Sequence, residues 1–372
     1  MASPAGDVQR VDLVLLDPGV YVVFVRPRYT HHAGLRAATA GGPCPDAAKL
    51  VDSVQVQLMH AATNGSAFAA RAHTLPRCTH GEHLGRWLNQ IWQPLHCSYE
   101  AVHATWLQQC AERHTYGKNR PLWLAFVGDS VMRGLFFDVL EKLLDKPADR
   151  SWGKAVTNGK FDLNTSNGSA GSQLDLLSGH MRIRMISGSP YTLGTEQGLS
   201  VSELRTLLYL DGKNSPHRPD VLILGASVAW DVKFGDLQAF ARNLKRMLHA
   251  VRGYTRVIWV TPVAIHHYPS PGCRSCSPES FAFMTFPRSQ MYSRVATALA
   301  KEAGIADIVD GWAMTIGARM WSAYEHYDAL YAPRTDGHVS RKIADVLLNT
   351  VCSPMRYADR NSVRPFGAER AT

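Results

Sequence analysis

Residues 121–354 alternate between short apolar runs and segments in which apolar residues recur three and four positions apart. The apolar runs predict buried strands, and the second pattern predicts amphipathic helices. The predicted strands are residues 123–127, 180–187, 220–226, 256–265 and 305–311, and the predicted helices are residues 131–145, 237–251, 288–304 and 340–351. Because single helices separate most of these strands, we expect parallel βαβ units in a three-layer, doubly wound α/β fold. In such a sheet, sites form at the carboxyl ends of the strands.

Two segments carry more specific expectations. Residues 180–187 alternate between polar and apolar side chains over most of their length, which is typical of an edge strand or a strand with one solvated face. We therefore expect Arg182 and Arg184 to face solvent, and the alternative is that they track an acidic polymer. In the third predicted helix, Met291 and Tyr292 are expected in the core.

The pattern in the first part of the chain predicts β structure. Residues 11–27 are rich in Val, Leu and Tyr around an Asp17-Pro18-Gly19 turn, and residues 53–61 alternate cleanly. We expect a small β-sandwich here, placed before the α/β domain. The expected division of the chain is a β-sandwich-like region at 1–77, a connecting segment at 78–120, the α/β domain at 121–354 and a tail at 355–372.

The connecting segment holds three cysteines and three tryptophans. These cysteines are Cys78, Cys97 and Cys110. Their spacing predicts a cross-linked segment packed onto the α/β domain, and the alternative is an ordinary aromatic core patch.

Charge and hydrophobicity exclude few classes of protein. The chain has 372 residues, a hydrophobic content of 45% and a formal net charge of +9. The basic residues are scattered and form no run of five or six, whereas a nucleic-acid binder concentrates them on one face or tail. A solvated basic surface is the favoured interpretation, with an acidic glycan or a membrane headgroup as alternatives.

The seven cysteines bear on redox compartment and on metals. The lone Cys273-Arg-Ser-Cys276 lies in a Pro/Ser/Gly-rich loop and has no second pair at zinc-ribbon spacing, so we expect loop disulfides, no metal and no cofactor. With glycosylation sequons at Asn64, Asn164 and Asn167, the cysteines favour the secretory pathway, in the Golgi lumen or outside the cell. The first ten residues lack a signal-peptide layout, and no stretch approaches a membrane span, so a targeting segment is missing from this chain or this localisation is wrong.

A polar seam interrupts two apolar runs at Gly128-Asp129-Ser130. Ser130 is expected at the carboxyl end of the first α/β strand and at the start of a helix, where backbone N–H groups and the helix dipole stabilise an oxyanion. It is a candidate nucleophile. The alternative is that Asp129 or Ser130 only caps the helix.

A nucleophilic serine needs a general base that a third group orients. The chain supplies Asp336-Gly337-His338 just before the last predicted helix. An early Gly-Asp-Ser, a parallel sheet and a late Asp/His pair together favour nucleophilic catalysis over chance.

These residues resemble the SGNH (GDSL-like) hydrolase superfamily in its PC-esterase branch. That branch includes trichome-birefringence-like polysaccharide O-acetyltransferases, sialic-acid O-acetyltransferases and neurexophilin-and-PC-esterase proteins. VGDSVMRG resembles the family's first block, with Arg133 three positions after the serine, and DGHVSRKIADVLLNTVC resembles its last block. GRWL…WQPLHC…LQQC is similar to the family's approach to the first block. DPGVYVVFV…SVQVQLMHA is similar to the sandwich that precedes the esterase domain in neurexophilin-and-PC-esterase proteins.

The resemblance implies roles for individual residues. Ser130 would be the nucleophile, His338 the general base and Asp336 its orienting acid. The oxyanion hole would use the Ser130 N–H, Gly188 and a side chain after the third strand. Arg133 would bind an anionic substrate group or the acyl carbonyl, with a structural anchor as the alternative.

The sequence departs from the family pattern in two places. After the third strand the usual Asn is absent, so Ser227 is the remaining oxyanion donor, while Trp230 and Asp231 match the latter part of a family pattern and are expected at the substrate. The last block is Asp-x-His where the family has Asp-x-x-His, so Asp328 is the substitute if Asp336 points away from the imidazole.

Two further histidines, His266 and His267, follow the strand at 256–265. They are expected in a solvated loop, and the alternative is that they contact a sugar hydroxyl.

We therefore expect transfer of an acyl group, most simply acetyl, to or from a carbohydrate hydroxyl through a Ser130 acyl-enzyme. The partners would be a carbohydrate acceptor and an acyl donor, without nucleic acid and without a membrane span in this chain. The rival is a non-catalytic glycan- or protein-binding module on the same fold, which the two departures favour. A lipid esterase is a third hypothesis, for which the sequence shows no clear lid.

Overall fold

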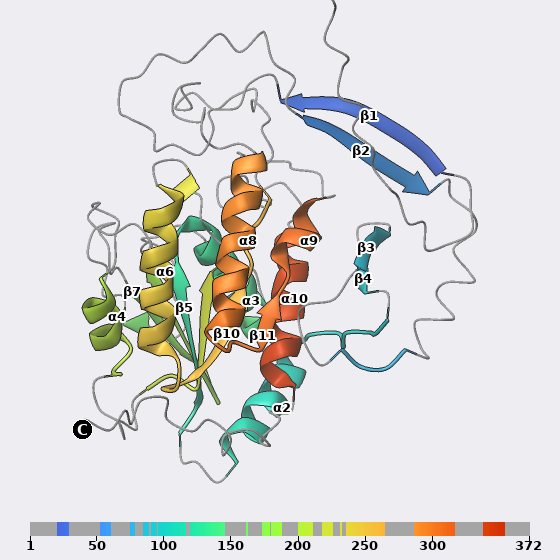
Figure 1. The fold of residues 1–372 in the computed structure, drawn as a ribbon. Coiled ribbons are helices and arrows are strands. Elements are labelled where there is room, and N and C mark those ends of the chain that lie inside the picture. The colour runs from blue at the N-terminus through green and yellow to red at the C-terminus, as the bar shows by residue number, and fades with distance from the viewer. Residues whose placement is uncertain are drawn as a thin grey trace, which may run out of the picture.

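The computed structural model describes the α/β domain, parts of the connecting segment and two strands of the N-terminal region (Figure 1). The described residues are 21–29, 53–60, 75–78, 85–88, 91–94, 96–116, 120–145, 161–162, 173–178, 180–187, 200–210, 218–225, 231–232, 236–264, 286–316 and 338–353.

A seven-stranded sheet forms the centre of the molecule, in the spatial order β11-β10-β9-β5-β8-β7-β6. Its parallel strands are β5 (Leu122–Gly128), β8 (Met181–Ser187), β9 (Val221–Gly225), β10 (Arg256–Val260) and β11 (Asp307–Val309). The remaining edge is antiparallel and consists of β7 (Gln173–Ser178) and β6 (Phe161–Asp162). The prediction of a parallel, doubly wound sheet is confirmed for the five strands that the βαβ pattern indicated.

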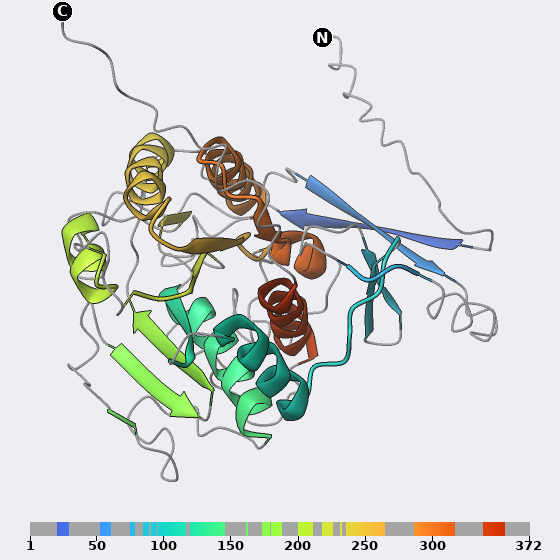
Figure 2. The same ribbon diagram turned by 90° about the horizontal axis from the view of Figure 1, so that it is seen from below.

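Helices cover both faces of this sheet (Figure 2). One face carries α2 (Ala104–Thr115), α3 (Ser130–Leu144), α9 (Gly311–Ile316) and α10 (His338–Cys352). The other carries α4 (Val201–Leu207), α6 (Leu237–Val251) and α8 (Phe286–Glu302). Successive side chains of β5 alternate between two separate apolar cores: Leu124 and Phe126 face α3, whereas Ala125 and Val127 face α6. Burial on both faces explains why this strand reads as a continuous apolar run.

The expectation of a solvated arginine face on β8 is wrong for Arg184, while Arg182 is half-buried. β8 is an interior strand between β5 and β7, and the side chain of Arg184 is buried. The Arg182 guanidinium lies 4.5 Å from the centre of the Trp123 ring, and Arg184 Nη1 donates a hydrogen bond to the Leu207 carbonyl at 3.2 Å. A charged side chain is usually expected in solvent. Here stacking on a tryptophan and a hydrogen bond to the end of a helix allow arginines to lie on a covered face of the sheet.

The core assignment in α8 is right for one residue and wrong for the other. Tyr292 is fully buried, whereas Met291 is 37% exposed. Adjacent positions on a helix point about 100° apart, and in α8 Tyr292 and Ser293 fall on the inner side while Met291 falls at its outer edge.

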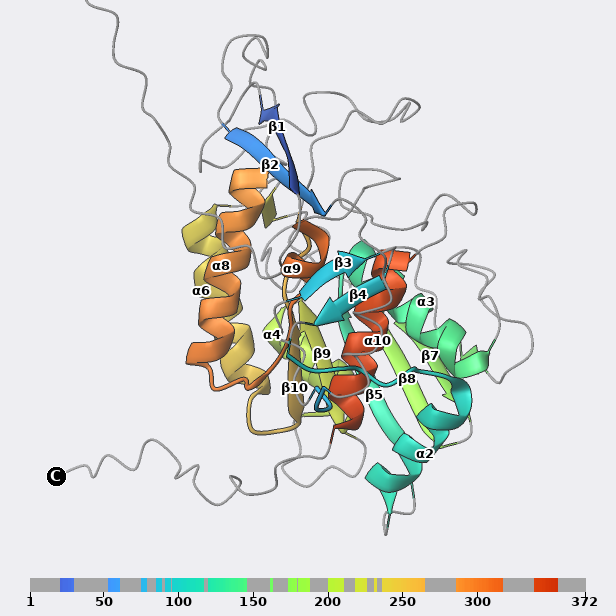
Figure 3. The same ribbon diagram turned by 90° about the vertical axis from the view of Figure 1, so that its right-hand side faces the viewer.

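Two hairpins lie outside the main sheet. β1 (Tyr21–Tyr29) pairs antiparallel with β2 (Ser53–His60), and β3 (Gly85–Leu88) pairs antiparallel with β4 (Ile91–Pro94). The predicted strand at 53–61 is confirmed, while the Asp17-Pro18-Gly19 turn lies outside the described residues. The β3–β4 hairpin lies beside α9 and α10 (Figure 3). The β-sandwich and the domain boundaries stay predictions.

The connecting segment is cross-linked, as the cysteine spacing predicted. Cys78 pairs with Cys97 within the segment, and Cys110 of α2 pairs with Cys352 at the end of α10. The other three cysteines, Cys44, Cys273 and Cys276, lie outside the described residues.

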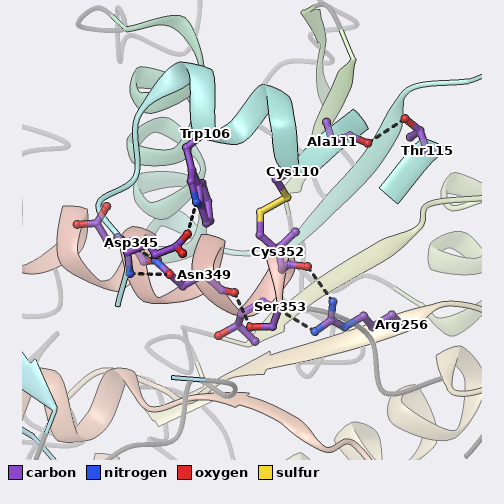
Figure 4. The surroundings of a disulfide bond; sticks show 12 residues. Trp106, Cys110, Ala111, Thr115, Arg256, Asp345, Asn349, Cys352 and Ser353 are labelled. Carbon is purple, nitrogen blue, oxygen red and sulfur yellow. Dashed lines mark hydrogen bonds between the residues drawn. A yellow bond between two sulfur atoms is a disulfide. The ribbon is translucent and has the colours of Figure 1, made fainter. Parts of the chain in front are cut away.

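Polar contacts around the second disulfide fix the same end of α10 (Figure 4). The Asn349 side chain makes two hydrogen bonds with the backbone of Glu100, at 3.0 and 3.1 Å. Arg256 donates to the carbonyls of Thr350 and Val351 at 2.8 and 2.9 Å. A cation at the last carbonyls of a helix satisfies orphan acceptors and opposes the negative end of the helix dipole.

No helix within the described part of the chain combines the length and the apolar character needed to cross a membrane.

The Cys110–Cys352 disulfide should contribute more to stability than Cys78–Cys97. It closes a loop of 242 residues against 19, and loop-closure entropy in the unfolded chain grows with loop length. We expect Cys110→Ala/Cys352→Ala to lower the free energy of unfolding by about 3–5 kcal/mol, and Cys78→Ala/Cys97→Ala to lower it by about 2 kcal/mol less than that. Urea unfolding of both double variants measures this, and a larger loss for the short loop would contradict the ranking.

Candidate functional site

The site lies where the winding of the sheet reverses. β5 and β9 are neighbours, but β5 continues into α3 on one face and β9 leads towards α6 on the other. A crevice forms outside the carboxyl ends of two strands whose helices part in this way, and ligands of open α/β sheets bind there. The polar seam Gly128-Asp129-Ser130 lies at this point.

Two glycines allow the strands to approach closely at the switch point. A Cβ on Gly128 would lie 2.6 Å from Cβ of Met132 and 3.3 Å from the carbonyl oxygen of Gly225. Gly225 has a φ of +103°, and a Cβ there would lie 2.1 Å from the Val260 carbonyl oxygen. A larger residue at Gly225 would therefore clash with β10 in a backbone conformation that L-residues rarely adopt.

Asp129, not Ser130, caps α3. The Asp129 side chain accepts a hydrogen bond from the Val131 N–H at 2.9 Å, and Ser130 is the first residue of the helix. The capping interpretation therefore holds for Asp129 and is wrong for Ser130. The backbone N–H groups of the first helical turn and the positive end of the helix dipole lie at this position. The side chain of Ser130 lies outside the described part of the chain.

The Asp129 carboxyl group is buried at the seam, and burial raises its pKa to about 6. The hydrogen bond from Val131 and the positive charge of Arg133 act in the opposite direction. A buried ionisable group with a raised pKa at the carboxyl end of a strand makes this position a candidate site, and the same carboxyl group also serves as the cap of α3.

Arg133 is half-buried one helical turn from Asp129. Its charge reaches Asp129, which places it at the carboxyl edge of the sheet. Both of its interpretations, substrate contact and structural anchor, are consistent with this position.

The second catalytic candidate begins the last helix. His338 is the first residue of α10, and its side chain lies outside the described residues. Three polar contacts join α3 to α10: Asp138 to Ser340, Glu141 to Arg341 at 3.4 Å, and Lys142 to Asp345 at 2.6 Å. The residue numbers rise together along the two helices. α3 and α10 therefore run parallel, and both start at the carboxyl edge of the sheet (Figure 3).

Asp231 lies in a buried polar cluster between the segment after β9 and α8. Its side chain is 1% exposed, and its charge, with that of Asp236, raises the pKa of Tyr292. Burial contributes most to this shift, which brings the Tyr292 pKa to about 12. The cation in the cluster is Arg288, which is also buried and donates to the Val232 carbonyl at 2.6 Å.

The buried cation Arg288 was not predicted from the sequence. Its guanidinium Nη2 also donates to the Tyr292 hydroxyl at 3.3 Å, and burial lowers its pKa. It stands in the first turn of an amphipathic helix, where an arginine usually faces water, so composition gives no signal of burial. The Trp230-Asp231 pair in the sequence was the available hint.

A second polar network missed by sequence lies after β10 and β11. The Thr261 hydroxyl donates to Asp310 at 3.2 Å and accepts from the Trp312 N–H at 2.8 Å, and Asp310 caps α9. Burial and the charge of Asp310 raise the pKa of Tyr99, so the connecting segment reaches this edge of the sheet. The Asp-Gly step after an apolar strand, at residues 310–311, was the sequence signal.

The other predicted site residues fall outside the described part of the chain. They are Gly188, Ser227, Trp230, Asp328, Asp336, His266 and His267, and their roles stay predictions. Among the described residues, no group of three or more His, Cys, Asp or Glu side chains is arranged to hold a metal ion.

Asp129 should make stability depend on pH. Its folded pKa of about 6 exceeds the unperturbed 3.8, so the folded state holds the proton more tightly, and stability is lost as pH rises from about 4 to above 6. Asp129→Asn keeps the capping oxygen without the charge. We expect its unfolding free energy to fall less over this range than that of the wild type, by about 1–3 kcal/mol.

Urea unfolding between pH 4 and 7 measures this difference. Asp236→Asn is the control, since Asp236 caps α6 from an exposed position. Parallel pH profiles for the wild type and Asp129→Asn would refute the assignment.

Comparisons with known proteins leave the family of the chain open. Neither a protein-family model nor a curated protein matches the sequence. Solved structures that resemble it include an acetyl xylan esterase, at 15% identity, 51% of this chain, 77% of the other and a TM-score of 0.28. A peptidoglycan O-acetylesterase resembles it at 10% identity, 68% of this chain, 96% of the other and a TM-score of 0.36. At such identities and TM-scores these likenesses carry no weight for function, which rests on the chain's own residues.

Proposed function

We propose that this protein transfers or removes an acyl group, most simply acetyl, at carbohydrate hydroxyls through an acyl-enzyme on Ser130. The observation that carries the proposal is the position of Ser130 as the first residue of α3, at the carboxyl end of β5 and at the switch point of the sheet. A hydroxyl there meets a helix N-terminus, which is suited to stabilising a developing oxyanion.

In the proposed reaction, Ser130 Oγ attacks the acyl carbonyl carbon while His338 takes the hydroxyl proton. The tetrahedral oxyanion is stabilised by the Ser130 N–H, with Gly188 and Ser227 as further donors. His338 then protonates the leaving group as the acyl-enzyme forms. Attack by a sugar hydroxyl on this intermediate gives transfer, and attack by water gives hydrolysis. Asp336, or Asp328 in its place, orients the imidazole.

The substrate class rests on the resemblance of the first and last sequence blocks to PC-esterases, which favours transfer to a glycan. Arg133, Trp230 and Asp231 are the proposed substrate contacts, although the burial of Asp231 favours a supporting position for its carboxylate. Two disulfides among the described residues support an oxidising compartment, so we propose the Golgi lumen or the cell exterior.

A glycan- or protein-binding module on the same fold is the second candidate. The Asp-x-His spacing and the absent Asn after the third strand favour it, because a misdirected acid and a lost oxyanion donor each weaken catalysis.

Labelling by a fluorophosphonate separates the two candidates. We expect the wild type to be labelled at Ser130, and Ser130→Ala and His338→Ala to lose at least about 10³-fold in labelling rate. Ser200→Ala and His180→Ala are matched controls, since Ser200 caps α4 and His180 is exposed before β8, and both should be labelled as the wild type is. A folded wild type that resists the probe would favour the binding module.

The orienting acid can be assigned by a pair of isosteric substitutions. Losing the carboxylate that holds the imidazole should lower the rate by up to about 10⁴-fold, because the imidazole then adopts the wrong tautomer. The sequence prediction places this loss in Asp336→Asn and only a minor change in Asp328→Asn. Steady-state hydrolysis of an activated acetyl ester measures both, and the reverse result would assign the role to Asp328.

A further inference from the structure

A buried carboxyl group on α3 faces the start of α10. Asp138 is fully buried, although it lies on a helix whose other buried residues from Leu135 onward are apolar. The Ser340 hydroxyl of α10 donates a hydrogen bond to its Oδ2. Removing a carboxyl group from water costs several kcal/mol unless hydrogen bonds replace the lost water, so this contact contributes to the way in which the two helices pack.

The contact joins the two helices whose first residues are the catalytic candidates. Asp138 follows Ser130 by eight residues on α3, and Ser340 follows His338 by two residues on α10. Both helices are rigid over these spans, so the contact sets the position of the first residue of α10 relative to the first residue of α3. Nearer to the start of α10 than Ser340, only His338 and Val339 remain, and Val339 packs in the apolar core.

A second tie joins the same helices further along. Lys142 Nζ lies 2.6 Å from Asp345 Oδ1, and both side chains are 19% exposed. This ion pair holds the helices together without touching the first turn of α10. The helix pair therefore contains its own control: the Ser340–Asp138 contact lies near the candidate site, and the Lys142–Asp345 pair lies away from it. A third, longer contact joins Arg341 to Glu141 at 3.4 Å.

We propose that Asp138 and Ser340 are positioning residues, which set the imidazole of His338 against the hydroxyl of Ser130. The inference rests on the proposed function for its catalytic part. Its structural part, the anchoring of the first turn of α10 by Asp138, stands independently of any reaction. Because displacements of about 1 Å between reacting groups can cost 10²-fold in rate, a lost anchor should act on the chemical step more than on binding.

Four variants test the inference in the full-length chain. Ser340→Ala and Asp138→Asn remove or weaken the contact, Ser340→Thr retains the hydroxyl, and Lys142→Met breaks only the distant ion pair. We expect fluorophosphonate labelling of Ser130 to slow by roughly 10-fold or more in the first two and to stay within about twofold of wild type in the others. With an activated acetyl ester, the loss should fall on kcat, with KM nearly unchanged.

Hydrogen exchange supplies a readout that needs no activity. Amides in the first turn of α10 should exchange at least about tenfold faster in Ser340→Ala and Asp138→Asn, and at the wild-type rate in Lys142→Met and Ser340→Thr. If the wild type is not labelled at all, the proposed function fails, and faster exchange still supports the anchor. Unchanged exchange in Ser340→Ala and Asp138→Asn, or equal loss of labelling in Lys142→Met, would overturn the inference.

Discussion

The attachment of the last helix to the rest of the chain is the constraint on which the candidate site depends. α10 brings His338 to the carboxyl edge of the sheet, yet the helix is 15 residues long and comes from the far end of the sequence. Its last turn is fixed by a disulfide to α2, by Asn349 against Glu100 and by Arg256 at the final carbonyls. Its first turn is fixed by Ser340 against Asp138.

The carboxyl edge of the sheet concentrates residues whose backbone conformation or burial lowers the free energy of unfolding. Gly225 holds a backbone conformation that few residues adopt, and Asp129, Asp231 and Arg288 are ionisable groups removed from water. Each is costly unless hydrogen bonds or opposite charges replace the lost hydration. They gather after β5 and β9, whose own side chains are apolar, and this agrees with a sheet that is stabilised by its core and uses its carboxyl edge for chemistry.

The fold was largely predictable because the strands of this sheet are buried on both faces and the helices are amphipathic. The strand at 123–127 and the helix at 237–251 follow directly from these two patterns. Arg184 of β8 was misplaced because the sequence does not show that Trp123 and the end of α4 cover its face of the strand. Arg288 was missed for a related reason, since only the packing of α8 against the segment after β9 reveals that its cation is buried.

For the site, sequence indicated the chain positions but not the division of roles. The Gly-Asp-Ser seam left the cap and the nucleophile unassigned, and the observed hydrogen bond from Val131 assigns the cap to Asp129. The close approach of Gly128 to Gly225 joins residues almost 100 positions apart, which no local pattern predicts.

The most direct test of an acyl-enzyme on Ser130 is to look for this covalent intermediate. The protein would be incubated with an activated acetyl ester, quenched in acid and mapped by peptide mass spectrometry. We expect one acetyl group on the peptide that contains Ser130, absent from Ser130→Ala and strongly reduced in His338→Ala. A folded wild type in which this peptide stays unmodified, or in which only lysines are acetylated, would contradict an acyl-enzyme at Ser130.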